Sequence, residues 1–246
     1  MTGPIEPMPT EAIRAEKVVK TFGKITALAG VSLDVSWGQT LGILGDNGAG
    51  KSTLIKILTG YHQPDSGHVF VAGKPVQLAS VDDARALGIE CVYQDLALVN
   101  GLSIYHNMFL NHREMRRRAA AALAEIGIEV VSVDLEVGQL SGGQRQAIAV
   151  ARAVSSQARI LLLDEPLAAM GAREAQLIIR LIERLKSRGD IAIVMIAHNY
   201  AQTLEICDRV MLVQHGEVTF ESTAAATSPA ELLEIVRREY RAARGA

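Results

Sequence analysis

Short apolar runs alternate with segments of helical periodicity along most of the chain. The runs lie at Thr40–Gly45, Ile89–Gln94, Arg159–Asp164, Ile191–Ala197 and Arg209–Val213. Each run is apolar almost throughout, as strands buried on both faces of a sheet are. Continuous apolar strands separated by helices predict a mostly parallel sheet covered by helices, so we expect an α/β fold.

Helical periodicity fills the gaps between these runs. We expect helices at Lys51–Thr59, Leu102–Leu123, from about Ser141, at Ala172–Arg188 and at Pro229–Arg244. The segment Ala172–Arg188 is the clearest, because its leucines and isoleucines fall on one stripe and Gly189 follows as a stop.

The N-terminal part has a different pattern. Ala12–Ser36 alternates loosely and carries β-branched residues, which predicts two or three short antiparallel strands. Val69–Ala72 and Val76–Leu78 are further strand candidates around a turn at Gly73-Lys74-Pro75. We therefore expect one unit over residues 11–246, with an antiparallel β subdomain at its start and a helical subdomain inserted at about 95–157. Residues 1–10, with three prolines, are expected to be a flexible lead-in.

Composition narrows the class of protein. The 246 residues are 49% hydrophobic and 21% charged with net charge −2, which fits one sizeable globular core and no nucleic-acid partner. Cys91 and Cys207 lie in or beside apolar runs and are interpreted as buried free thiols. No basic segment leads into an apolar one at the start, and no apolar run approaches roughly 18–20 residues. Work at a membrane would therefore need another protein to hold the chain there.

A glycine-rich loop is the first candidate site. It fits G-x-x-x-x-G-K-[ST] between a strand and a helix, in the residues Gly45, Asp46, Asn47, Gly48, Ala49, Gly50, Lys51 and Ser52. Inward N–H groups and the helix N-terminus favour phosphates, Lys51 can reach the β- and γ-phosphates, and Ser52 can ligate Mg²⁺. The alternative is a plain glycine turn with a chance Lys-Ser. The loop predicts a nucleoside triphosphate and does not select among the enzymes that use one.

Two adjacent carboxylates end the strand before Pro166. Asp164 stands at the carboxyl end of its strand, where open α/β sheets bind ligands, and is the candidate Mg²⁺ ligand. Glu165 can point past the metal to a water in line with the γ-phosphate, as hydrolysis requires. The alternative is an acidic pair that only caps the strand.

A second anion-binding segment follows the helical middle of the chain. Ser141 is a good N-cap, and Gly142 and Gly143 leave N–H groups bare at a helix start before Gln144. Two phosphate-binding devices with one nucleotide loop suggest that the second serves the nucleotide of another copy.

At this point the chain resembles the ATP-binding cassette family over nearly its whole length, with LSGGQ at Leu140–Gln144 as the family's signature. The resemblance implies that Phe22 stacks on adenine, that Gly45–Thr53 is the Walker A loop and that Thr53 shares in nucleotide binding. It implies that Gln94 touches Mg²⁺ and senses a transmembrane partner, and that His198 contacts the γ-phosphate. It also implies a head-to-tail dimer that sandwiches two ATPs.

The implied site can be stated by role. The expected catalytic residues are Glu165, His198 and Gln94, and the expected Mg²⁺ ligands are Ser52, Gln94 and Asp164. ATP is expected to lie between Phe22 and Gly45–Thr53 of one chain and Ser141–Gln144 of the other.

The amino-acid sequences of several segments are similar to those of the ATPase subunits of bacterial monosaccharide importers. The clearest are GDNGAGKSTLIKILTGYHQPDSG and GIECVYQDLALV. This implies a separate permease, an extracytoplasmic sugar-binding protein, and a peripheral place on the cytoplasmic face of the inner membrane. An exporter subunit, a non-transport cassette and a cassette that binds without turnover are the alternatives.

Some features leave choices open. In the family that the chain resembles, most cassettes carry aspartate where Gly171 stands, although sugar-importer relatives often have glycine, so we expect a branch-specific variation of the contact between subunits rather than a broken enzyme. The apolar segment 95–110 is either core or part of a groove for the permease. Arg113–Arg118 is interpreted as a solvated helix face.

Overall fold

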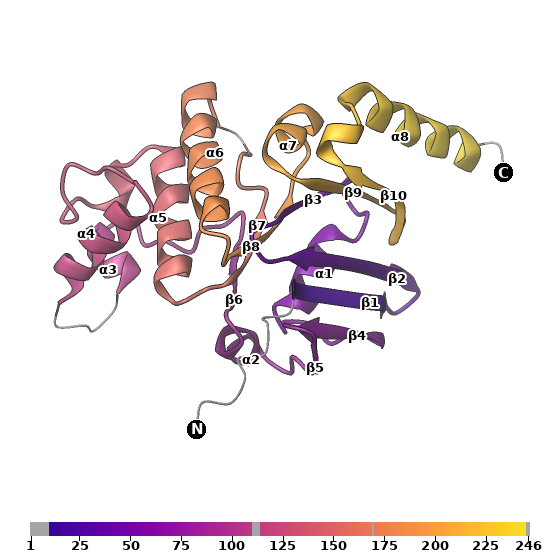
Figure 1. The fold of residues 1–246 in the computed structure, drawn as a ribbon, viewed down its shortest axis with the longest axis horizontal. Helices are drawn as coiled ribbons and strands as arrows, with labels where there is room; N and C mark the ends of the chain where they lie inside the picture. Colours follow the sequence, from indigo (N-terminus) through magenta and orange to yellow (C-terminus); the bar gives the residue numbers. More distant parts are fainter. Residues whose placement is uncertain (1–9, 110–113, 169, 245–246) are drawn as a thin grey trace.

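The computed structural model describes residues 10–109, 114–168 and 170–244. The chain forms two β-sheets with helices around them (Figure 1). The expected flexible lead-in, apart from Thr10, lies outside the described residues. The α/β class, the antiparallel start and the mostly parallel sheet are as the sequence predicts, whereas the limits 95–157 of a helical subdomain stay a prediction.

The larger sheet has the strand order β10-β9-β3-β8-β7-β6. Its strands are β3 (Thr40–Leu44), β6 (Ile89–Val92), β7 (Ile160–Asp164), β8 (Ala192–Ile196), β9 (Arg209–Gln214) and β10 (Glu217–Thr223). All neighbours pair in parallel except β9 and β10, which form an antiparallel hairpin at the edge. The parallel order places the ends of β3, β8 and β7 at one edge of the sheet.

The smaller sheet is antiparallel, in the order β2-β1-β4-β5. Its strands are β1 (Glu11–Phe22), β2 (Ile25–Ser36), β4 (Ser66–Val71) and β5 (Lys74–Val76). Two long strands replace the two or three short ones expected over Ala12–Ser36. The predicted turn at Gly73-Lys74-Pro75 is wrong in part, because Lys74 and Pro75 belong to β5. That strand is at the sheet edge, where a proline's missing N–H breaks no ladder bond.

Helices cover the parallel sheet and form a group beside it (Figure 1). They are α1 (Lys51–Leu58), α2 (Val81–Ala86), α3 (Ile104–Met108), α4 (Met115–Glu125), α5 (Gly142–Ser155), α6 (Ala172–Ser187), α7 (Tyr200–Ile206) and α8 (Pro229–Arg244). The single helix predicted over Leu102–Leu123 is wrong. Phe109 leaves α3 with extended backbone (φ −139°, ψ 97°), so α3 and α4 are separate helices.

The parallel strands are buried on both faces, as their composition predicts. On β7, Leu161 and Leu163 pack into a cluster with α5 and α6, whereas Ile160 and Leu162 pack into a second cluster with α1 and the antiparallel sheet. Alternate side chains of one strand thus join two cores. The sequence left segment 95–110 as either core or part of a permease groove. Ile104, Tyr105 and Met108 in this segment are core residues, which supports the first of these interpretations.

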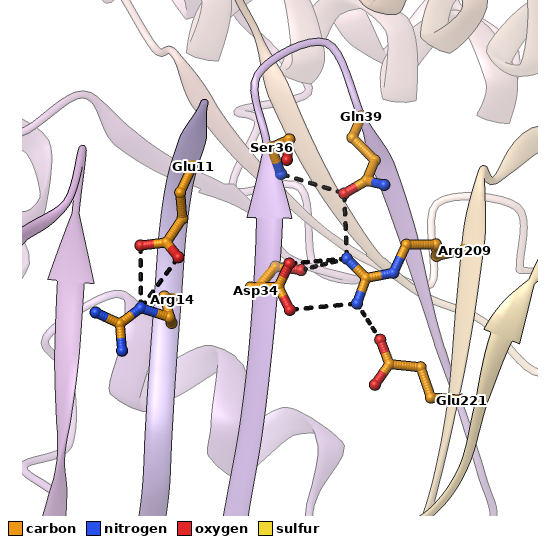
Figure 2. A network of polar contacts seen from close by, with 7 residues as sticks. All are labelled: Glu11, Arg14, Asp34, Ser36, Gln39, Arg209 and Glu221. Atoms are coloured by element: carbon orange, nitrogen blue, oxygen red, sulfur yellow. Dashed lines mark hydrogen bonds and ion pairs between the residues drawn. The ribbon is translucent and has the colours of Figure 1, made fainter. Parts of the chain in front are cut away.

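Arg209 ties the two sheets together (Figure 2). Its guanidinium donates to Asp34 of β2 at 2.9 Å (Nη1 to Oδ2) and 3.3 Å (Nη2 to Oδ1), and also to the Asp34 carbonyl. It also donates to Gln39, which precedes β3, and to Glu221 of β10. Arg209 is on β9 of the parallel sheet, so one rigid fork of donors joins β2, β9 and β10.

The remaining sequence expectations concern thiols, basic residues and the membrane. Cys207 is buried, and burial raises its pKa to about 12, whereas Cys91 is only partly buried. Arg116 and Arg117 are solvated, as expected, and Arg113 lies outside the described residues. Within the described ranges, every helix is too short or too polar to cross a lipid bilayer.

The Arg209 fork generates a stability prediction. Arg209→Lys keeps the charge but loses the paired geometry to Asp34 and reaches fewer acceptors, so we expect the free energy of unfolding to fall by about 1 kcal/mol. Differential scanning calorimetry should record a melting temperature lower by about 2–4 °C. Arg117→Lys, at an exposed ion pair, is the matched control and should melt as the parent does. Equal melting of both variants would contradict a clamp at Arg209.

Candidate functional site

The phosphate-binding loop lies between β3 and α1, where the chain turns sharply. Gly45 has φ 142°, and a Cβ there would lie 2.1 Å from the carbonyl oxygen of Val213, so only glycine fits. Lys51 folds back into the loop, and its Nζ donates to the carbonyl oxygens of Gly45 and Asp46, each at 2.7 Å. The loop is thereby wrapped around the Lys51 side chain, and this residue is only 5% exposed.

Burial and charge act against each other on that lysine. Burial lowers the pKa of Lys51, and the carboxylates of Glu165, Asp46 and Asp164 act in the opposite direction. Three acids therefore act electrostatically on one cation from the ends of β3 and β7. Such a cation can neutralise a polyphosphate that enters the loop.

Asp164 is the half-buried carboxylate at the tip of β7. Burial raises its pKa, the negative charge of Glu165 adds to the rise, and Lys51 opposes it. A carboxylate in this position gains from a nearby divalent cation. No cluster of three or more His, Cys, Asp or Glu side chains suited to a metal exists among the described residues.

Glu165 and His198 form the closest polar contact at this edge. His198 Nε2 lies 2.6 Å from Glu165 Oε1, and an ionised carboxylate accepts this bond from Nε2–H. Glu165 has a left-handed backbone (φ 54°) and its N–H donates to the carbonyl of Ile196 at 3.1 Å, which holds the strained turn against β8. A cavity of about 290 Å³ adjoins the pair, lined among others by Pro166, Gln202 and Thr203.

Gln94 and Ser52 border the same edge. Gln94 is exposed, two residues beyond β6, and β6 pairs directly with β7. Ser52 is exposed in the first turn of α1. The structure therefore gathers Lys51, Asp164, Glu165 and His198 into one charged group and sets Gln94 and Ser52 on its border.

Phe22 ends β1, in the antiparallel sheet. Asp65 fixes this strand end, because it accepts hydrogen bonds from the Lys20 ammonium at 2.7 Å and the Thr21 N–H at 2.6 Å. Phe22 is 44% exposed, and its ring makes a T-shaped contact with the His62 ring at a centroid distance of 5.2 Å. Tyr61 in turn contacts His62 at 4.9 Å. No sequence motif includes Tyr61 or His62, since their contact with Phe22 and with each other depends on how the end of α1 meets β1.

The signature segment stands apart from this group. Ser141 caps α5, with Gln144 N–H donating to its Oγ at 3.3 Å and Ser141 N–H donating to Gln144 Oε1 at 3.0 Å. Helix α5 packs on α6, α3 and β6, whereas the phosphate loop begins α1, which packs on β2 and β7 (Figure 1). Gly142 and Gly143 thus present their N–H groups from a different part of the molecule.

Glu174 is a residue that sequence reasoning missed. It lies in the first turn of α6 and its Oε2 accepts a hydrogen bond from Gly171 N–H at 3.4 Å. Gly171 has an ordinary φ of −69°, and a Cβ there would meet nothing within 4 Å. Position 171 can therefore carry an aspartate, but in this chain the nearby carboxylate comes from Glu174.

Comparison with known proteins gives relatives along most of the chain. Residues 28–168 match the family model for ABC transporters. The chain is 41% identical to a xylose/arabinose import ATP-binding protein of Sulfolobus acidocaldarius, covering 92% of this chain and 94% of that protein. It is 39% identical to a fructose import ATP-binding protein of Rhizobium meliloti, covering 83% and 85%. A ribose import ATP-binding protein of Corynebacterium glutamicum is 38% identical but is matched over only 43% of its length.

Solved structures give the same fold. A nucleotide-free ATP-binding cassette from an ABC transporter superposes with a TM-score of 0.82 at 25% identity, covering 92% of this chain and 95% of that one. A dimeric cassette in a post-hydrolysis state with ADP and phosphate superposes with a TM-score of 0.74 at 26% identity, covering 86% and 98%.

The buried ammonium generates a binding prediction. Lys51→Ala removes the cation that the loop surrounds, so ATP affinity should fall by about 100-fold, which corresponds to about 2.8 kcal/mol. Isothermal titration calorimetry with ATP measures this. Lys74→Ala, on the exposed edge strand β5, is the control and should bind as the parent does. Parent-like affinity in Lys51→Ala would refute the assignment of the loop.

Proposed function

The chain belongs to the ABC transporter family of ATP-binding cassettes, and from this premise we propose that it is the ATP-hydrolysing subunit of a monosaccharide importer. The observation that carries the hydrolytic part is the Glu165–His198 contact of 2.6 Å beside the lysine-filled loop. The sugar-import part is supported by the relatives, which are named as import ATP-binding proteins for xylose and arabinose, fructose, and ribose.

In this proposal the phosphates of ATP replace the two carbonyl contacts of Lys51. The N–H groups of Gly45–Thr53 and the positive end of α1 hold the β- and γ-phosphates. Phe22 offers an exposed ring for the adenine. His62 makes a T-shaped contact with that ring and is itself in contact with Tyr61. The exposure of Phe22 supports this role, since a ring kept for the core would be buried.

Asp164, Ser52 and Gln94 are the residues proposed to hold Mg²⁺. When held by these residues, the cation would supply positive charge to the β- and γ-phosphate oxygens. The raised pKa of Asp164 supports the assignment, because a bound cation removes the penalty that burial and Glu165 place on the ionised carboxylate.

Glu165 is proposed to orient the attacking water and accept its proton. His198 holds the Glu165 carboxylate through Nε2 and offers a polar contact to the γ-phosphate. The left-handed backbone of Glu165 aims its side chain out of the line of β7, while Asp164 stays in the strand. Two neighbouring acids thereby take different tasks, one toward the metal and one toward water.

The complete site is proposed to form between two copies of the chain. Ser141, Gly142, Gly143 and Gln144 of one copy would meet the γ-phosphate bound by the other copy. The separation of α5 from α1 within one chain supports this arrangement, as does the dimeric cassette among the similar structures. Hydrolysis would then reopen the pair, and ATP and the permease would bias the same open–closed equilibrium.

The proposal extends to partners and place. A transmembrane permease would contact the face that carries Gln94, and an extracytoplasmic sugar-binding protein would act through that permease. The chain would be peripheral on the cytoplasmic face of the inner membrane, as a single cassette over 11–246 with a helical subdomain at about 95–157 and no nucleic-acid partner.

The role of Glu165 yields a kinetic prediction. Glu165→Gln keeps the shape and the contact to His198 but cannot accept a proton, so ATPase turnover should fall by about 10²–10⁴-fold. ATP binding should persist, and sedimentation velocity should detect an ATP-dependent dimer. Glu205→Gln, on the exposed face of α7, removes the same charge and should turn over normally. Unchanged turnover in Glu165→Gln would remove Glu165 from the proposed chemistry.

A further inference from the structure

The start of α6 lies against the start of α5 at van der Waals contact. A Cβ on Gly143 would lie 2.9 Å from the Cβ and 3.2 Å from the Cα of Glu174, closer than real side chains come. Gly143 is therefore required by packing within one chain, apart from any contact with a nucleotide. The close approach fixes Glu174 directly beside the signature segment.

The carboxylate of Glu174 is directed at the signature donors. Both of its oxygens lie 3.9 Å from the position that a Cβ on Gly142 would take. Gly171 N–H donates to Glu174 Oε2 at 3.4 Å. The nearby Ser141 hydroxyl and the backbone N–H groups of Gly171, Gly143 and Gly142 lower the pKa of Glu174. The side chain is therefore an ionised acid at neutral pH that is bonded at the start of α6 and lies beside the donors at the start of α5.

These donors are the ones that the proposed function gives to the γ-phosphate of the partner's ATP. The N-terminus of α5 attracts one anion, and Ser141 has a single O–H to donate. A carboxylate and a phosphate at the same few donors repel one another, and each weakens the hold on the other. An ATP that docks on this surface meets an anion of the same chain beside these donors.

We propose that Glu174 is an internal counter-anion that lies beside the signature donors in the separate chain and has to turn away from them when the partner's ATP binds. The inference rests on the proposed two-chain site. It adds a residue that sets the ATP concentration at which that site closes. The open space beside Gly171 gives the side chain room to turn away.

The consequence is that dimer closure needs a higher ATP concentration. If the Glu174 carboxylate is turned away from the signature donors in a fifth of the molecules, the ATP concentration needed for dimer formation rises about fivefold. Two chains therefore stay separate until the ATP concentration is high.

The test uses the Glu165→Gln chain, in which hydrolysis does not deplete ATP. Dimer fraction is measured by sedimentation velocity across an ATP titration with Mg²⁺. Adding Glu174→Gln removes the competing charge and keeps the side-chain length, so the ATP midpoint should fall about fivefold. ADP should give no such gain, because the competition is with the γ-phosphate.

Two further variants sharpen the result. Glu183→Gln removes the same charge from the exposed face of the same helix and should leave the midpoint unchanged. Glu174→Asp keeps an acid in the first turn of α6 but draws it back by one methylene, so the midpoint should fall by about twofold. This second variant serves if Glu174→Gln does not fold.

The outcomes separate the two claims. If Glu165→Gln itself forms no dimer at any ATP concentration, the two-chain site fails. If it dimerises and both Glu174 variants keep or raise its midpoint, the counter-anion is overturned while the two-chain site stands. A gain in Glu183→Gln equal to that in Glu174→Gln would also overturn it, since the cause would then be net charge.

Discussion

The parallel pairing of β3, β8 and β7 is the constraint on which the site depends. Because neighbouring parallel strands end at one edge, Lys51 after β3, Asp164 at the end of β7 and His198 after β8 meet there although the sequence separates them widely. The Arg209 fork then joins this sheet to the antiparallel one, whose strand β1 ends at Phe22. Charge chemistry and the exposed aromatic ring are thus set by one arrangement of strands.

At two places in the molecule, groups of the chain itself stand where phosphate oxygens would contact hydrogen-bond donors. Lys51 bonds loop carbonyls and is acted on by three nearby acids, while the carboxylate of Glu174 lies beside the signature donors. In both places the donors that phosphates would use already have an acceptor or an anion of the same chain close to them. Binding a nucleotide therefore means exchanging these internal neighbours for phosphate oxygens, and the free energy of closure is the difference between the two states rather than the whole of the new contacts.

Local pattern predicted most of the fold and most of the candidate residues, because the glycine loop, the strand-end acids and LSGGQ are short and contiguous. The break at Phe109 was missed because the apolar run in the sequence continues through it. Strand β10 was missed although Glu217–Thr223 alternates; the hairpin before it turns on His215 and Gly216, both at positive φ. Glu174 and His62 could not be found this way, since their contacts arise from helix–helix and helix–strand packing between distant segments.

The central claim is that each nucleotide site is built from two chains, and mixing two inactive variants tests it most directly. Lys51→Ala disables the loop of one chain and Ser141→Arg disables the signature of the other. A mixed dimer places both faults in one site and leaves the second site intact. The account predicts that ATPase activity, absent from each variant alone, appears when the two are mixed. A mixture that stays inactive, while native mass spectrometry detects the mixed dimer, would contradict it.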